Sequence, residues 1–136
     1  MVGYGVDFSK WTAWTEEDYE KIIMETTKII EEGKDRKEVG IAYYNRGWAY
    51  YVKHQEEKAI PDFTEAIEIM PKFADVYFMR GASYYMFYEN EKALIDAQKA
   101  LELNKTDLQF INFIEKLKKE LEEEKAHGTT ADAGSK

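Results

Sequence analysis

The chain has 136 residues, and its 44% hydrophobic and 15% aromatic content is enough to form the core of one compact domain. It contains no cysteine, which excludes disulfides, zinc fingers and thiol chemistry, and a reducing cytoplasm is the expected location. A formal charge of −8 without a basic stripe argues against nucleic acid and anionic lipid as partners, because binding to phosphates requires clustered Lys and Arg.

The N-terminal segment, residues 1–14, is rich in aromatic and aliphatic side chains but has no signal-peptide pattern. No apolar stretch approaches the roughly 20 residues that a bilayer requires, so we expect no membrane insertion. The apolar residues of this segment are Tyr4, Val6, Phe8, Trp11 and Trp14. We expect them to need cover from water.

Residues 15–39 predict one helix followed by a loop. Thr15 and Asp18 have the spacing of a capping box, so the helix should begin at Glu16, and Gly33 should end it. An apolar stripe at helical spacing lies between them. Shifted by 37 residues, Thr27 of this helix aligns with Thr64. We therefore interpret 15–39 as a degenerate half-repeat with about three extra residues in its loop.

Residues 40–73 and 74–107 are two copies of a 34-residue unit. The gapless alignment has eleven identities, which are Tyr43/Tyr77, Arg46/Arg80, Gly47/Gly81, Tyr50/Tyr84, Tyr51/Tyr85, Glu57/Glu91, Lys58/Lys92, Ala59/Ala93, Asp62/Asp96, Ala66/Ala100 and Glu68/Glu102. Helical spacing with a break in each copy predicts two antiparallel helices per unit, near 41–53, 57–70, 75–87 and 91–104. The shared glycines and alanines should lie where the helices approach closely.

The C-terminal part predicts a capping helix over 107–125 and a disordered tail over 126–136. Thr106 begins a second capping box, and an apolar face with Phe110, Phe113, Ile114 and Leu117 follows. This face should pack on the second unit. The charged run from Lys118 onward suits a solvated helix end.

Both copies resemble the tetratricopeptide repeat (TPR). The first copy carries the resemblance in Tyr43, Arg46, Gly47 and Tyr50, followed by Ala59, Phe63, Ala66 and Pro71. The second departs at Ala97 and Lys105, where the family prefers an aromatic residue and proline. The resemblance implies an all-α fold of about six helices, in which antiparallel helix-turn-helix repeats stack into a right-handed superhelix.

In the TPR family the first helices of successive units line a concave binding groove. Carried onto this sequence, the groove positions are Ile41, Tyr44, Asn45, Trp48, Tyr51, Val52, Asp75, Phe78, Met79, Ala82, Tyr85 and Met86. Nine of the twelve are large and apolar, which is unusual for a surface in water. The candidate partner-binding residues are Tyr44, Asn45, Trp48, Tyr51, Phe78, Met79, Tyr85 and Met86.

Three candidates compete to cover this groove. Residues 1–14 could fill it from within the chain. A peptide or amphipathic helix of a partner protein could bind there, with aromatic anchors and Asn45 hydrogen-bonded to its backbone. A second copy of the chain could also stack on it, giving a homo-oligomer.

One ligand of the family can be tested residue by residue. TPR modules that clamp the acidic tail of heat-shock chaperones carry Asn on the first helix of a middle unit. They carry two basic residues, Lys and Arg, on the first helix of the next unit. Asn45 matches the first requirement, but Asp75 and Met79 occupy the positions of the bases. Together with the negative charge, this argues against an acidic ligand.

The candidate catalytic groups are few. The chain has two histidines, His54 in a predicted turn and His127 in the predicted tail, and no glycine-rich phosphate loop. We therefore expect no enzyme activity, no cofactor and no metal site. The sequence favours a non-catalytic scaffold or adaptor that binds a protein segment, and the alternative is a self-filled or self-associating structural domain.

Overall fold

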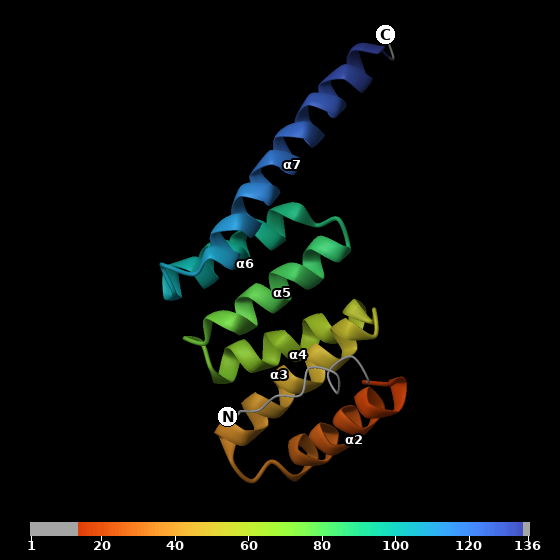
Figure 1. Cartoon of the computed structure of the whole chain (residues 1–136), viewed down its shortest axis with the longest axis vertical. Coiled ribbons are helices and arrows are strands. Elements are labelled where there is room, and N and C mark those ends of the chain that lie inside the picture. Colours follow the sequence, from red (N-terminus) through yellow and green to blue (C-terminus); the bar gives the residue numbers. More distant parts are fainter. Residues whose placement is uncertain (1–13, 135–136) are drawn as a thin grey trace.

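A computed structural model describes the backbone of residues 14–134 and the side chains of residues 14–128. This part of the chain contains six helices and no strand: α2 (Glu16–Glu32), α3 (Arg36–Val52), α4 (Glu56–Ile69), α5 (Ala74–Met86), α6 (Asn90–Leu103) and α7 (Leu108–Gly134). The helices stack along one axis, with α2 at one end and α7 projecting from the other (Figure 1). The expected all-α helical-repeat fold is confirmed.

The 34-residue period extends beyond the two predicted units. Helices α4 and α6 begin 34 residues apart, and so do α5 and α7. Val76 and Phe110 lie at equivalent positions of α5 and α7, and both are buried; the same holds for Ser83 and Leu117. Helix α7 therefore occupies the place of a third first helix, and it does so without sequence identity at these positions.

The helix of the N-terminal half-repeat begins and ends where the sequence predicts, but the loop that follows it is shorter than expected. The Thr15 hydroxyl accepts from the Asp18 N–H at 3.3 Å and the Asp18 carboxylate accepts from the Thr15 N–H at 2.7 Å, while Gly33 ends α2 at φ 58°. Helix α3 begins at Arg36, where the Asp35 carboxylate accepts from the Glu38 N–H at 3.0 Å. The extra residues expected in the loop thus belong to the first turn of α3, since Asp35 caps it.

Both units turn between their helices without glycine. His54 and Tyr88 occupy the left-handed region at φ 59° and φ 60°. In each turn two N–H groups donate back to the carbonyls at the end of the first helix, as from Gln55 to Tyr50 and from Glu89 to Tyr84. The identical bonding shows that the repeated fold imposes this conformation on side chains that disfavour it.

Close packing of helix pairs rests on the small residues shared by the two units. Ala59, Ala66, Ala93 and Ala100 are completely buried. A Cβ at Gly47 would lie 2.7 Å from Phe63 Cε1, and one at Gly81 would lie 3.1 Å from the Ala93 carbonyl oxygen. The prediction of close approach is confirmed at both glycines.

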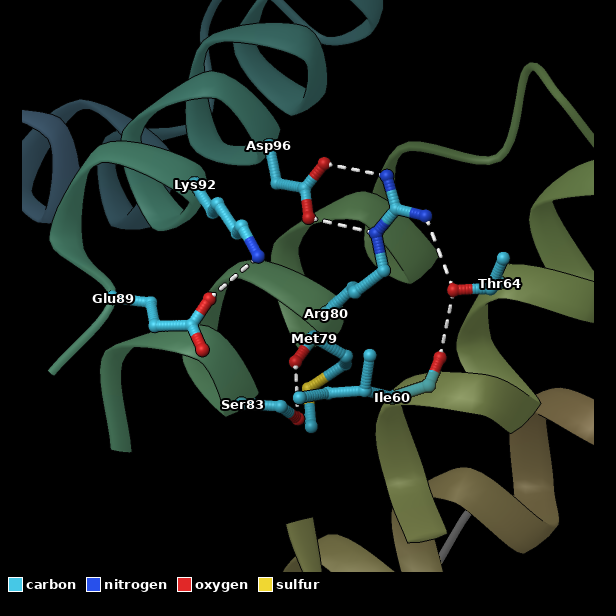
Figure 2. Close-up of polar contacts among 8 residues, drawn as sticks. All are labelled: Ile60, Thr64, Met79, Arg80, Ser83, Glu89, Lys92 and Asp96. Atoms are coloured by element: carbon cyan, nitrogen blue, oxygen red, sulfur yellow. Dashed lines mark hydrogen bonds and ion pairs between the residues drawn. The ribbon is translucent and has the colours of Figure 1, made fainter. Parts of the chain in front are cut away.

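In each unit, a shared arginine links the two helices of the unit to the helix that precedes it. The Arg80 side chain of α5 donates two hydrogen bonds to the Asp96 carboxylate of α6, both at 2.8 Å, and one to the Thr64 hydroxyl of α4 at 3.2 Å (Figure 2). Arg46 of α3 does the same with Asp62 of α4 and Thr27 of α2. Because Thr27 takes the role of Thr64, α2 acts as the second helix of a preceding unit.

The C-terminal tail continues α7. The helix includes residues 126–134, a range for which the sequence predicts a disordered tail. The preceding run contains strong helix formers, and extending an existing helix costs far less than starting one. Residues 1–13, which include most of the predicted aromatic N-terminal segment, and residues 135–136 lie outside the described part of the chain.

Replacing Asp96 by Ala should lower the free energy of unfolding by about 2–4 kcal/mol, because it leaves the Arg80 guanidinium without its carboxylate. The double variant Arg80→Met/Asp96→Ala removes both charges and should be more stable than the single variant. Urea unfolding measures both. The single variants Asp96→Ala and Arg80→Met each give a loss of unfolding free energy. A double variant whose loss equals the sum of these two losses would contradict a direct pairing.

The close approach at Gly47 predicts that Gly47→Ala lowers the unfolding free energy by about 1–3 kcal/mol despite the better helix propensity of Ala, since the Phe63 ring must move. Gly128→Ala in α7 is the matched control, because its added Cβ would meet no atom within 4 Å apart from its chain neighbours and the backbone of its own helix. In thermal unfolding, Gly47→Ala should lower the midpoint temperature, whereas Gly128→Ala should not lower it. Equal stabilisation by both changes would rule out steric contact at Gly47.

Candidate functional site

The eight predicted partner-binding residues lie on α3 and α5, and their surface is called here the α3–α5 face. Asn45 and Met86 are exposed, and the other six are half-buried. The half-buried residues are Tyr44, Trp48, Tyr51, Phe78, Met79 and Tyr85.

Trp48 is partly covered by the N-terminal part of the chain. Its ring lies 5.8 Å from the Tyr19 ring and meets the Trp14 ring edge-on at 5.9 Å, measured between centroids. Trp14 itself remains 41% exposed. The three rings form a small aromatic cluster in which Trp48 is half-buried.

Tyr44 and Tyr51 pack against the core beside α4. The Tyr44 ring lies 5.4 Å from the Phe73 ring and 6.1 Å from the Phe63 ring. Burial raises the pKa of the Tyr44 phenol, and the negative charge of Asp75 adds to the effect. Burial likewise raises the pKa of Tyr51, with a smaller contribution from Glu56. These tyrosines are therefore neutral contributors to the face at physiological pH.

Helix α7 covers the equivalent residues of the second unit. The Phe78 ring lies 5.0 Å from Phe110 and 5.4 Å from Phe113, and the Tyr85 ring lies 5.9 Å from Phe113. The Tyr85 hydroxyl lies 3.0 Å from Glu120 Oε1, and the Lys116 ammonium lies 4.8 Å from the ring centroid. The three expected covers did not include α7, so this part of the prediction is corrected. The sequence signal that could have predicted this cover is the 34-residue spacing between Val76 of α5 and Phe110 of α7.

The groove residues that remain accessible come from both units. Ile41 is 40% exposed and Met86 is 44% exposed, and Asn45 and Asp75 are exposed polar groups. An amide beside aliphatic and aromatic surface can donate to and accept from a ligand backbone while apolar side chains pack around it. The face thus offers recognition chemistry without a reactive group.

Other chemistry finds little support in the described residues. The His54 side chain is 82% exposed in its turn and lies 3.8 Å from Glu56, as expected for a solvated turn residue. No group of three or more acidic, His or Cys side chains within residues 14–128 has the arrangement of a metal site. Among the described helices, none combines the length and the apolar character needed to cross a bilayer.

A hollow of about 580 Å³ elsewhere in the molecule was missed by sequence reasoning. It lies where the α5–α6 turn faces the second half of α7, and Asn90, Glu120 and Glu124 are among its lining residues. The charged run of α7 was interpreted only as a solvated helix end. Nothing in the sequence alone brings that run opposite the turn, because this depends on α7 occupying the third first-helix position.

Comparison with known proteins identifies the repeat. The family model for the tetratricopeptide repeat matches residues 40–73. No curated protein sequence matches the chain.

Solved structures show the same fold. The chain is similar to the second TPR domain of human RPAP3, solved with the HSP70 peptide SGPTIEEVD, with 25% identity, 76% of this chain and 83% of that chain covered, and a TM-score of 0.68. It is also similar to the first TPR of Spaghetti (RPAP3) bound to the HSP90 peptide SRMEEVD (21% identity, 79% and 95% covered, TM-score 0.57). A third is the Sgt2 TPR domain from Aspergillus fumigatus (18% identity, 80% and 82% covered, TM-score 0.61).

The raised pKa of Tyr44 predicts a loss of stability at alkaline pH. The unfolded chain releases this proton near the ordinary pKa of 10.0 and the folded chain releases it at higher pH. The stabilisation is therefore complete below about pH 10 and is lost as the pH rises through the folded value. Tyr44→Phe should make the decline of unfolding free energy above about pH 9 shallower. The matched change Tyr88→Phe, at a ring that is 89% exposed, should leave the decline unaltered. Equal slopes for Tyr44→Phe and the wild type would contradict the assignment.

Proposed function

We propose that this chain, a tetratricopeptide-repeat protein by its repeat and its fold, is a non-catalytic protein-interaction module that binds a peptide or a helix of a partner protein on the α3–α5 face. The observation that carries the proposal is the setting of Asn45. This exposed amide lies one residue from the half-buried Tyr44 and three from Trp48, on a face that also presents the exposed Ile41.

The chemistry of the face supports a peptide ligand. Trp and Tyr are the residues that most often dominate binding energy at protein interfaces, and Trp48 and Tyr51 are each half-exposed on neighbouring turns of α3. Asn45 can bond both the N–H and the C=O of a ligand backbone. A ligand that buries apolar side chains beside Asn45 would satisfy both features.

The charge of the face argues for a ligand unlike those of the similar structures. The RPAP3 and Spaghetti domains were solved with HSP70 and HSP90 peptides that end in acidic residues. Here Asp75 is exposed on α5, and its negative charge contributes to the raised pKa of Tyr44. An acidic peptide would meet like charge, so we propose that the ligand is apolar and neutral or basic.

The non-catalytic part of the proposal follows from the side chains of the face, which include no nucleophile paired with a base. No cofactor is required for such binding. The absence of cysteine suits the reducing cytoplasm, in which we propose that the protein works.

A second candidate is that the N-terminal segment competes for the face, and the contact between Trp14 and Trp48 favours it. In this case the chain would regulate its own binding surface. Trp14→Ala would then increase the affinity for a partner peptide. If Trp14 only supports the fold, the same change would lower stability and leave affinity unaltered.

The test uses peptides selected from a random library with the wild-type chain, and the fluorescence of the chain on titration gives their affinity. Ile41→Ser and Asn45→Ala should each weaken binding about tenfold or more, which corresponds to roughly 1.4 kcal/mol. Ile95→Ser on α6 is the matched control, because Ile95 is 66% exposed and lies on a second helix away from the α3–α5 face. Circular dichroism verifies that each variant is folded. Equal loss in Ile95→Ser, or no loss in the first two variants, would overturn the proposal.

A further inference from the structure

Residues 1–13 share a sequence register with α3. At an offset of 37 residues, 2–31 align without a gap with 39–68, and the alignment covers both the segment before α2 and α2 itself. Its nine identities are Val2/Val39, Gly3/Gly40, Trp11/Trp48, Glu20/Glu57, Lys21/Lys58, Ile23/Ile60, Thr27/Thr64, Ile30/Ile67 and Glu31/Glu68. Six of the nine relate α2 to α4, and the first three relate the N-terminal segment to α3. The segment therefore corresponds in sequence to the first helix of the half-repeat.

Trp14 makes the contact expected near the end of such a first helix. In the repeat, Trp14 is equivalent to Tyr85 of α5, and Trp48 of α3 is equivalent to Lys116 of α7. The Trp14 ring lies 5.9 Å from the Trp48 ring, and the Lys116 ammonium lies 4.8 Å from the Tyr85 ring centroid. The two contacts thus join equivalent positions of successive units. The chain reaches α2 from the end of the first-helix position.

The face of α2 that would meet this first helix is open. In each complete unit the second helix packs on its first helix through an aspartate and two alanines, and these residues are at most 5% exposed. They are Ala59, Asp62 and Ala66 in α4, and Ala93, Asp96 and Ala100 in α6. The equivalent positions of α2 hold Ile22, Glu25 and Ile29, of which Glu25 is exposed and Ile29 is 40% exposed. Covering the apolar surface of this face would be favourable.

The sizes of the side chains on the two sides are complementary. In the first unit, large residues of α3 pack on a core that contains two alanines of α4. The equivalent residues of the first unit and the half-repeat are Tyr43/Val6, Tyr50/Ala13, Ala59/Ile22 and Ala66/Ile29. Large and small residues are therefore exchanged between the two sides, which approximately preserves the volume between them.

We propose that residues 1–13 take the place of this first helix, pack against Ile22 and Ile29 of α2, and extend the α3–α5 face with aromatic side chains. The segment has as many residues as α5, which has 13, and it leads directly to Trp14. Its aromatic residues and Trp14 are equivalent to residues on the α3–α5 face. The pairs are Tyr4/Ile41, Phe8/Asn45, Trp11/Trp48 and Trp14/Tyr51. A ligand on that face then also contacts Trp11, and this part of the inference rests on the proposed function.

Disulfide trapping tests the placement, because the chain has no cysteine of its own. A Cβ at Gly81 would lie 3.3 Å from Asp96 Cβ, close to the separation in a disulfide, and the equivalent pair in the half-repeat is Lys10 and Glu25. Under mild oxidation of the full chain, Lys10→Cys/Glu25→Cys should form an intramolecular disulfide about tenfold or more faster than Lys10→Cys/Ile95→Cys. Mass spectrometry of the intact chain and its peptides measures both rates.

A third cysteine pair tests whether the segment fills the α3–α5 face instead. Ala82 of α5 is the groove residue equivalent to Trp48, so Lys10→Cys/Ala82→Cys reports a segment that lies across the face. This pair should close as slowly as the pair with Ile95→Cys. Faster closure with Ala82→Cys than with Glu25→Cys, or equal rates for all three pairs, would overturn the placement.

The extension of the face is tested with the library-selected peptide. Trp11→Ala should weaken its binding about tenfold, as Asn45→Ala does. Met24→Ala is the matched control, because Met24 is 66% exposed on α2 and is equivalent to Pro61 of α4, outside the α3–α5 face. Unaltered or tighter binding by Trp11→Ala would overturn the extension. The disulfide rates need no ligand, so they decide the placement even if the face binds no peptide and the proposed function fails.

Discussion

Two arginines, Arg46 and Arg80, each join three successive helices through hydrogen bonds, and the stacking of the chain depends on them. In both units the Asp partner is nearly buried, with 7% and 4% of its side chain exposed, so it requires the guanidinium to remain ionised at low cost. The pairing raises the pKa of each arginine further above its already high value. The third bond, to a Thr hydroxyl of the preceding helix, fixes how one unit sits on the next.

The close packing of the glycine and alanine positions follows from this arrangement. The arginine and its Asp partner come from the two helices of one unit, and Gly47 faces Phe63 across the same pair. Once the pair is in place, the chain must reverse within a few residues. The left-handed conformations of His54 and Tyr88 provide the reversal at a cost that the packed helices offset. The α3–α5 face is then the set of first-helix side chains that this stacking leaves beside one another.

Much of the fold could be predicted because its determinants repeat. Arg46/Arg80 and Asp62/Asp96 are identical in the two units, and Thr27 and Thr64 align, although their joint hydrogen bonding was not foreseen. The start of α3 was missed because Asp35 lies before the repeat and its cap carries no periodic signal. Helix α7 was foreseen as a cap but not as a third first helix. Phe110 and Leu117 are buried like Val76 and Ser83 at the equivalent positions of α5, but the residue types differ, so the sequences do not align by identity.

The site was less accessible to sequence reasoning for a physical reason. Exposure at Phe78 and Tyr85 depends on the neighbour in space, and that neighbour is α7. The acidic hollow likewise depends on Asn90 and Glu124, which are 34 residues apart and meet only after α7 has packed. Residue types can indicate an apolar face, but which part of it stays open is decided by tertiary contacts.

The most direct measurement of the arginine-centred account is hydrogen exchange at the arginine Nε–H groups, observed by ¹H–¹⁵N NMR. The chain has three arginines, so the assignment is simple, and Arg36 is exposed at the start of α3 and serves as an internal reference. The account predicts that the Nε–H groups of Arg46 and Arg80 exchange much more slowly than that of Arg36, because each donates to a buried carboxylate. Exchange of all three at the rate of Arg36 would contradict it.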